Sequence, residues 1–288
     1  MADKGNQTFT SLAFDVMADK GNHTFTLAFD IMADKGNHTF TLAFDVMAHK
    51  GNYTFTLAFD VMAVKGIHTF RLAFDVLANK ENNTFTPHAY EVMADKGNHT
   101  FTLAFDVMAN KGNHTFTLAF DVMADKGNHT FTPLAFDVMA DKGNHTFTLY
   151  MMSWLIRGND TFTLAYDVMA DKGNHTFTPL AFDVMADKGN HTFALTYDVM
   201  ADKGTHTFTL AYDVMAEKGN HTFTLIFDVL ADKGNHTFTL AYDVMVDKGI
   251  HTFTPLAFDV MADKGIYTFT PLAFDVMADK GNHTVTLA

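Results

Sequence analysis

The chain contains no cysteine, only one tryptophan and only two serines, Ser11 and Ser153. Without cysteine there can be no disulfide framework and no thiolate metal site, so the redox compartment cannot be read from the sequence. Each serine stands at an irregular point of the chain, which leaves no basis for a Ser-His-Asp arrangement. We find no phosphate-binding glycine loop and predict no catalytic residue, no cofactor and no enzymatic activity.

Basic residues are also scarce. Lys and Arg number 20 against 33 Asp and Glu, which gives a net charge of -13. Nucleic-acid binding requires a basic stripe, and anionic membranes attract basic clusters, so we expect neither partner. No apolar run is long enough to span a membrane, and no signal peptide is visible at the first residues, so the sequence does not indicate a compartment.

The chain instead consists of tandem copies of one unit, Met-Ala-Asp-Lys-Gly-Asn-His-Thr-Phe-Thr-Leu-Ala-Phe-Asp-Val. Twelve copies contain 15 residues, six contain 16, and the last contains 12. We therefore predict a single tandem-repeat array over residues 1–288, with 18 full units, one truncated unit and no caps. A unit this short cannot bury a core alone, so it must stack on its neighbours.

The stretch from Met151 to Arg157 departs from the unit, and the genetic code accounts for it. The string ATG ATG TCA TGG CTG ATA AGG encodes these residues. In another frame it contains GAT GTC ATG GCT GAT AAG, which encodes Asp-Val-Met-Ala-Asp-Lys. The stretch is thus interpreted as the same repeat in a shifted frame, with Trp154 as a by-product, and a binding insert is the alternative. This points to a gene amplified from a minisatellite.

Within a unit, a turn signal precedes an alternating segment. In the copy from Met32 to Val46, Asp34-Lys35-Gly36-Asn37 is typical of a turn. The next nine residues alternate, which predicts a strand with Phe40, Leu42, Phe44 and Val46 on the buried face and Thr39, Thr41, Ala43 and Asp45 on the other.

The prolines divide this segment. All five (Pro87, Pro133, Pro179, Pro255 and Pro271) are inserted directly after the second Thr of a unit. An inserted residue inverts the faces of a continuous strand, so we expect a corner there and two short strands per unit. The favoured fold is therefore an all-β, solenoid-like array with one unit per rung.

A short helix in each repeat, giving an α/β solenoid, is the alternative. The segment from Thr254 to Gly265 has a Thr N-cap, Pro at the first helical position and Gly past the end. Helices, however, pack 8 to 10 Å apart, about twice the spacing of paired strands. In the β array, Phe side chains would stack as buried ladders, and a carboxylate repeated on every rung would make the array pH-sensitive.

Other polar residues recur at fixed places in the unit. Asn-x-Thr glycosylation signals are present, for example at Asn37, but we interpret Asn as a turn residue. The histidines beside the turn, such as His38, could hold zinc or nickel if stacked. We expect solvated edge histidines instead, and no Asp-rich calcium loop is present, so no metal site is predicted.

The most specific pattern is Thr-x-Thr once per unit. In a parallel solenoid both threonines face outward and stack into two rows. The array resembles the insect antifreeze β-helices, particularly the moth family, in a unit near 15 residues and in Thr-x-Thr. The resemblance implies an ice-binding threonine surface, with Thr24, Thr26, Thr39, Thr41, Thr100, Thr102, Thr115 and Thr117 among its residues.

The chain departs from that family in three ways. It has no disulfides, Phe stands between the two threonines, and Arg71 and Ala194 interrupt the rows. Two functional hypotheses remain: a repeat-derived product without a specific biochemical role, and a structural, adhesive or ice-binding surface protein. Uncapped end rungs also predict self-association.

Overall fold

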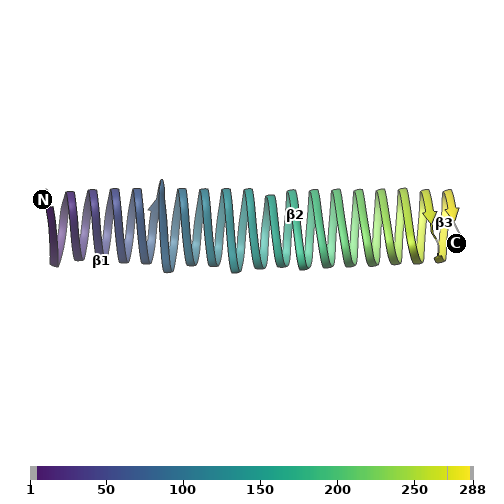
Figure 1. Cartoon of the computed structure of the whole chain (residues 1–288), viewed down its shortest axis with the longest axis horizontal. Coiled ribbons are helices and arrows are strands. Elements are labelled where there is room, and N and C mark those ends of the chain that lie inside the picture. The colour runs from purple at the N-terminus through teal and green to yellow at the C-terminus, as the bar shows by residue number, and fades with distance from the viewer. Residues whose placement is uncertain (1–4, 271, 286–288) are drawn as a thin grey trace. The chain divides into compact units, whose positions relative to one another are not determined.

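The computed structural model describes residues 5–270 and 272–285, and all of its regular structure is β. The elements are β1 (Gly5–Ala78), β2 (Glu81–Phe269) and β3 (Leu272–Val285), which form one parallel sheet in the order β1-β2-β3. Each strand is long because the chain winds in a coil and pairs with the coil that follows (Figure 1). No described residue lies in a helix. The β-solenoid is thus confirmed, and the alternative of one helix per repeat is wrong.

The chain divides into two compact units, residues 1–145 and 146–288. Each unit is a stack of coils with one sequence repeat per coil. In unit 1, Thr69 pairs with Thr84, one 15-residue repeat later; in unit 2, Leu256 pairs with Leu272, one 16-residue repeat later. The repeat length therefore sets the length of the coil.

The inserted residues are accommodated at one point of the coil. Phe70 pairs with Phe85 at an offset of 15 residues, whereas Leu72 pairs with His88 at an offset of 16. The register thus shifts where Pro87 is inserted, at the predicted corner. A corner tolerates the extra residue because the strands on both sides keep their inward and outward faces.

Burial shows which side chains face inward. In one repeat these are His38, Phe40, Ala43 and Val46, and Ala48 of the next. The alternation is broken around Gly36, after Thr41 and at Asp45, so each coil has three corners. The prediction that Leu42 and Phe44 are buried and Ala43 is exposed was wrong, because the corner after Thr41 inverts the faces: Ala43 is buried and the other two are half-exposed.

Two of the corners use positive φ angles. Gly36 has a φ of 141°, and a Cβ at this position would overlap the carbonyl oxygen of Gly21 in the preceding coil. Only glycine permits this close approach of stacked backbones. Asp45 has a φ of 49°, the left-handed conformation that Asp and Asn adopt more readily than other non-glycine residues. Both requirements recur in nearly every repeat, which accounts for their fixed positions.

Aromatic side chains stack from coil to coil in two ladders. The inner ladder is buried; Phe101 and Phe116 are typical, with ring centroids 4.9 Å apart and planes at 5°. The outer ladder is half-buried and includes Phe105 and Phe120, also 4.9 Å apart. Each fully buried Phe stabilises the fold by about 1.5–3 kcal/mol. The ladders fix coil-to-coil spacing near the distance between paired strands.

Candidate functional site

The threonine face is the outward surface of the strand between the Gly corner and the corner after the second Thr. In one coil it consists of Asn113, Thr115 and Thr117, all exposed. The residues between them, His114 and Phe116, are buried. Alternation in one strand therefore separates a polar outer surface from an aromatic interior.

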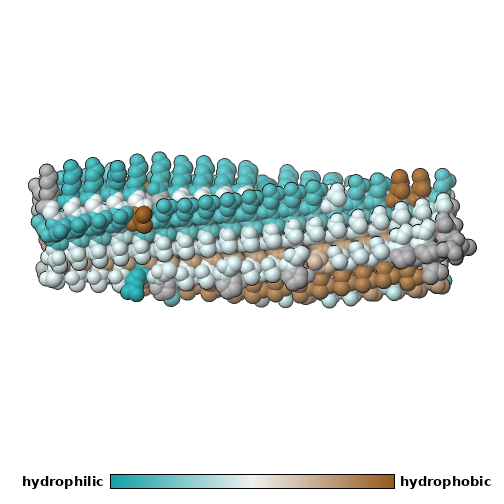
Figure 2. Space-filling model, in the orientation of Figure 1, coloured by the Kyte–Doolittle hydropathy of each residue, from teal (hydrophilic) through white to brown (hydrophobic). Residues whose placement is uncertain are grey.

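In each unit, like residues of successive coils form rows on this face. Neighbouring coils are about 4.8 Å apart, and residues i and i+2 along a strand are roughly 6.7 Å apart, so the threonines form a two-dimensional lattice. Figure 2 shows the continuous rows of like side chains that such stacking produces. The asparagine row is itself linked: Asn174 donates from Nδ2 to Oδ1 of Asn159 at 3.1 Å.

The predicted surface residues all lie on this face. They are exposed, except for Thr102, which is half-buried; the set is Thr24, Thr26, Thr39, Thr41, Thr100, Thr102, Thr115 and Thr117. The Phe between each pair points inward, so it does not interrupt the lattice. Arg71 is exposed and Ala194 is half-buried, each in the row of second threonines.

The histidines beside the turn whose burial the structure describes lie inside the coils, so the prediction of solvated edge histidines was wrong. His114 and His191 are each only 1% exposed. The physical reason is the alternation of a strand. His is two residues before the inner Phe in an unbroken strand, so both side chains point inward. The alternation of the sequence contained this signal.

In unit 2 the buried histidines form a stack above Asp160. His175 Nε2 lies 3.1 Å from a carboxylate oxygen of Asp160, and both side chains are inaccessible. The stack continues through the later coils with centroid distances of 4.7–5.0 Å; its members are His175, His191, His206, His221, His236 and His251.

Some neighbouring imidazoles are hydrogen-bonded. The Nδ1 atoms of His206 and His221 are 2.9 Å apart, and those of His236 and His251 are 3.0 Å apart. One ring of each pair must donate and the other accept, so the two rings of a pair cannot both carry a proton on Nδ1. Burial, together with the smaller effect of the neighbouring His206, lowers the pKa of His221 to about 3.

Unit 1 has a similar internal stack of histidines, in which another residue replaces histidine in some coils. Burial, followed by the charges of the neighbouring His129 and His99, lowers the pKa of His114 to about 3. Tyr53 occupies the histidine position in another coil and donates from its hydroxyl to the carbonyl oxygen of Ala33 at 3.1 Å. The position therefore accepts a second aromatic residue that does not titrate near neutral pH.

Charged side chains line the remaining corners. Lys and Asp of the turn are adjacent and weakly paired, as in Lys126 and Asp125 at 4.0 Å. The left-handed residue of the other corner is Asp, as at Asp121, or in one coil Glu91, and it is exposed wherever the structure describes its burial. Across the described residues, no cluster of three or more His, Cys, Asp or Glu has the arrangement of a metal site.

The backbone of the irregular segment from Met151 to Ile156 continues as strand. Its side chains, including that of Trp154, lie outside what the structure describes, so the binding-insert hypothesis remains a prediction. Within the described ranges, no helix is long and apolar enough to span a membrane.

Comparisons with family models, with curated proteins and with solved structures gave no match.

Proposed function

We propose that this is a non-enzymatic surface-binding protein whose threonine face adheres to an ordered surface, with ice as the first candidate. The observation that supports the proposal is the in-register stacking of outward threonines, as at Thr115 and Thr117, over a buried aromatic ladder. The proposed ligand is therefore a repeating lattice, because the face itself repeats.

Two features of the face favour such a ligand. Each threonine presents a methyl and a hydroxyl group, so the rows offer regularly spaced apolar and hydrogen-bonding groups. The β-branched side chain has few rotamers on a strand, so little conformational entropy is lost on binding. The stacked Phe116-type rings beneath hold the backbone in place. A rigid lattice can contact a rigid lattice over many coils, and weak contacts add up.

Thermal hysteresis and ice recrystallisation assays on the purified chain test this proposal. We expect activity in the original chain and a large loss when Thr115 and Thr117 are both changed to Tyr, because the ring would stand above the face. Lys111→Tyr, at an exposed position of the same coil, is the matched control and should retain activity. A chain that is folded by circular dichroism but inactive in both assays would refute ice binding.

A second candidate is a repeat-derived product without a selected role. The observation that favours it is the near-identity of the copies at exposed positions, such as Lys111 and Met108, where packing imposes little constraint. Recent copying of a DNA unit explains this uniformity without selection on the protein. Comparing repeats at the nucleotide level tests this second candidate. Selection on the protein predicts an excess of silent differences between repeats, whereas recent copying predicts no such excess.

A further inference from the structure

Each unit carries a row of outward methionines that neither the fold nor the threonine face requires. In unit 2 its last members are Met245, Met261 and Met277, and Met261 pairs directly with Met277 across neighbouring coils. All three are exposed by 48% or more, in contrast to the buried Val246 and Ala262 that follow the first two. Exposed thioethers contribute little to stability, so the row is available for binding.

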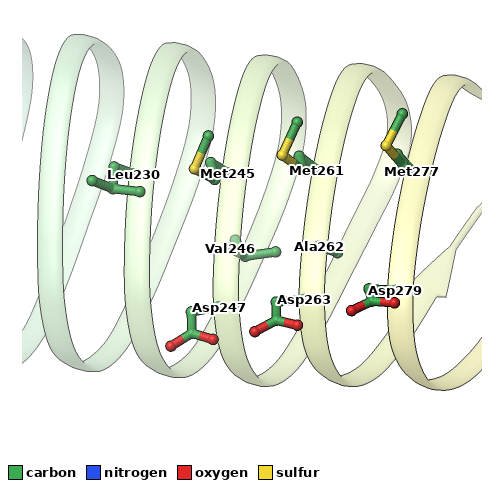
Figure 3. A pocket seen from close by; sticks show the side chains of 9 residues that line it. All are labelled: Leu230, Met245, Val246, Asp247, Met261, Ala262, Asp263, Met277 and Asp279. Atoms are coloured by element: carbon green, nitrogen blue, oxygen red, sulfur yellow. The ribbon is translucent and has the colours of Figure 1, made fainter.

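The row forms one wall of a groove of about 580 Å³. Figure 3 shows the three methionine side chains lying parallel, with each sulfur on the same side of its coil. Asp247, Asp263 and Asp279 form the opposite wall, and Val246 and Ala262 lie between the two walls. The groove thus combines a column of thioether sulfurs with a column of carboxylates.

The spacing of the column suits a bridging ion. Paired coils place equivalent atoms about 4.8 Å apart. A two-coordinate ion between two sulfurs needs a separation of roughly 4.6 Å, twice a metal–sulfur bond of about 2.3 Å. The coil spacing is close to this separation, and the unbranched methionine side chain is flexible enough to adjust the sulfur position by rotation about χ1 and χ2.

The chemistry of the ligands selects the class of ion. Thioethers are soft and prefer Cu(I) and related monovalent ions, whereas carboxylates alone favour hard divalent cations. The carboxylate wall adds attraction for any cation without supplying the coordinating atom. A further row of Asp, including Asp243 and Asp259, precedes the methionines by two residues and is exposed. Carboxylates therefore flank the methionine row on both sides.

We propose that stacked methionines of this row bind soft monovalent metal ions, Cu(I) or Ag(I), between neighbouring coils. The buried histidines do not compete, because the core gives an ion no access to them. Ions on successive coils repel each other, by about 1 kcal/mol at this spacing in water. Because each two-coordinate ion uses two sulfurs, the row holds no more than one ion for each pair of stacked methionines.

Substitutions already present among the repeats indicate which variants of the methionine row the fold accepts. Leu230 occupies the methionine position between Met215 and Met245, and it is exposed like its neighbours. Leucine is thus accepted by the fold at this position, so Met261→Leu should remove a ligand without unfolding the coil. Conversely, Leu230→Met should restore the missing ligand and join two separate parts of the row.

The experiment is a titration of the full chain with Ag(I) in chloride-free buffer. Binding is followed by the chemical shifts of ¹³C-labelled methionine methyl groups and by the number of ions bound in native mass spectrometry. We expect shifted methyl signals, fewer ions bound by the Met261→Leu variant, and more ions bound by Leu230→Met. Unshifted methyl signals, or an unchanged number of ions in both variants, would overturn the proposal. Circular dichroism of both variants checks that the fold is kept.

Discussion

Acidification should destabilise the chain from about pH 6 downward, before most carboxylates protonate, because the buried histidines must remain neutral in the fold. Burial, together with the smaller effect of the neighbouring histidines, holds the pKa of His191 and His236 at about 3. Burial also lowers the pKa of His206 and His251 to about 4. In the unfolded chain these groups return to about 6.5. The unfolded state therefore binds more protons below that value, and stability falls as the pH falls.

The magnitude of this loss of stability follows from the number of buried histidines. Each histidine contributes a slope of about 1.4 kcal/mol per pH unit between the folded and unfolded pKa values. The five in unit 2 with a pKa near 3 or 4 together give roughly 7 kcal/mol per pH unit. A typical domain stability of about 5–15 kcal/mol is then exhausted between about pH 6 and pH 4. Above pH 7 the contribution no longer changes.

Guanidinium unfolding followed by circular dichroism at several pH values between 8 and 5 measures this slope. His221→Tyr is the matched variant, because Tyr267 already fills the equivalent position and donates to the carbonyl oxygen of Asp247 at 3.3 Å. The variant should lower the slope by about 1.4 kcal/mol per pH unit. A free energy of unfolding that stays constant from pH 7.5 to pH 5.5 would refute the reasoning.

Five further substitutions test the corners and the ladders by chemical denaturation. Gly36→Ala should destabilise the fold by at least about 1–3 kcal/mol, since its Cβ would overlap the carbonyl oxygen of Gly21; an unchanged midpoint would contradict the stacked corner. Phe116→Ala should cost about 3–5 kcal/mol, and Phe120→Ala of the half-buried outer ladder clearly less; equal losses would contradict the assignment of the two ladders. Asp121→Val should cost about 1–2 kcal/mol at a φ of 50°, whereas Asp121→Gly should be neutral or stabilising, and the reverse order would exclude the left-handed corner.

The sequence predicted the all-β fold, the length of the coil and the corner after the second Thr. Two regular signals carried this information: a glycine once per unit, and alternation from His38 to Thr41. The inserted prolines then located the corner, since only a break between strands accepts an extra residue without inverting the face beyond it.

The inward residues after that corner could not be predicted in the same way. Hydrophobicity favours Leu42 and Phe44 over Ala43 for the core, yet the corner turns the small residue inward. The interior near the left-handed Asp45 thus holds Ala43 and Val46, and the larger residues cover the outside. Asp45 itself gives no clear signal, because Asp is common in turns of many conformations.

The candidate sites, too, could be predicted only where the alternation of a strand places their residues. The outward position of Thr39 and Thr41 follows from alternation alone, and so does the burial of His38, which we assigned to the surface because imidazole is polar. The pH sensitivity that we predicted for a carboxylate ladder stays a prediction, and the buried histidines are a second source of pH sensitivity. The methionine row was missed because thioethers are commonly taken as core residues, and its exposure depends on the corner at Asp45.

Far-UV circular dichroism of the purified chain through a thermal melt tests the central claim most directly, because every row described above depends on the stacked coils. A β spectrum that is lost in a cooperative transition is the predicted result. A coil spectrum without a transition would contradict the solenoid, and with it the threonine face, the histidine stack and the methionine row.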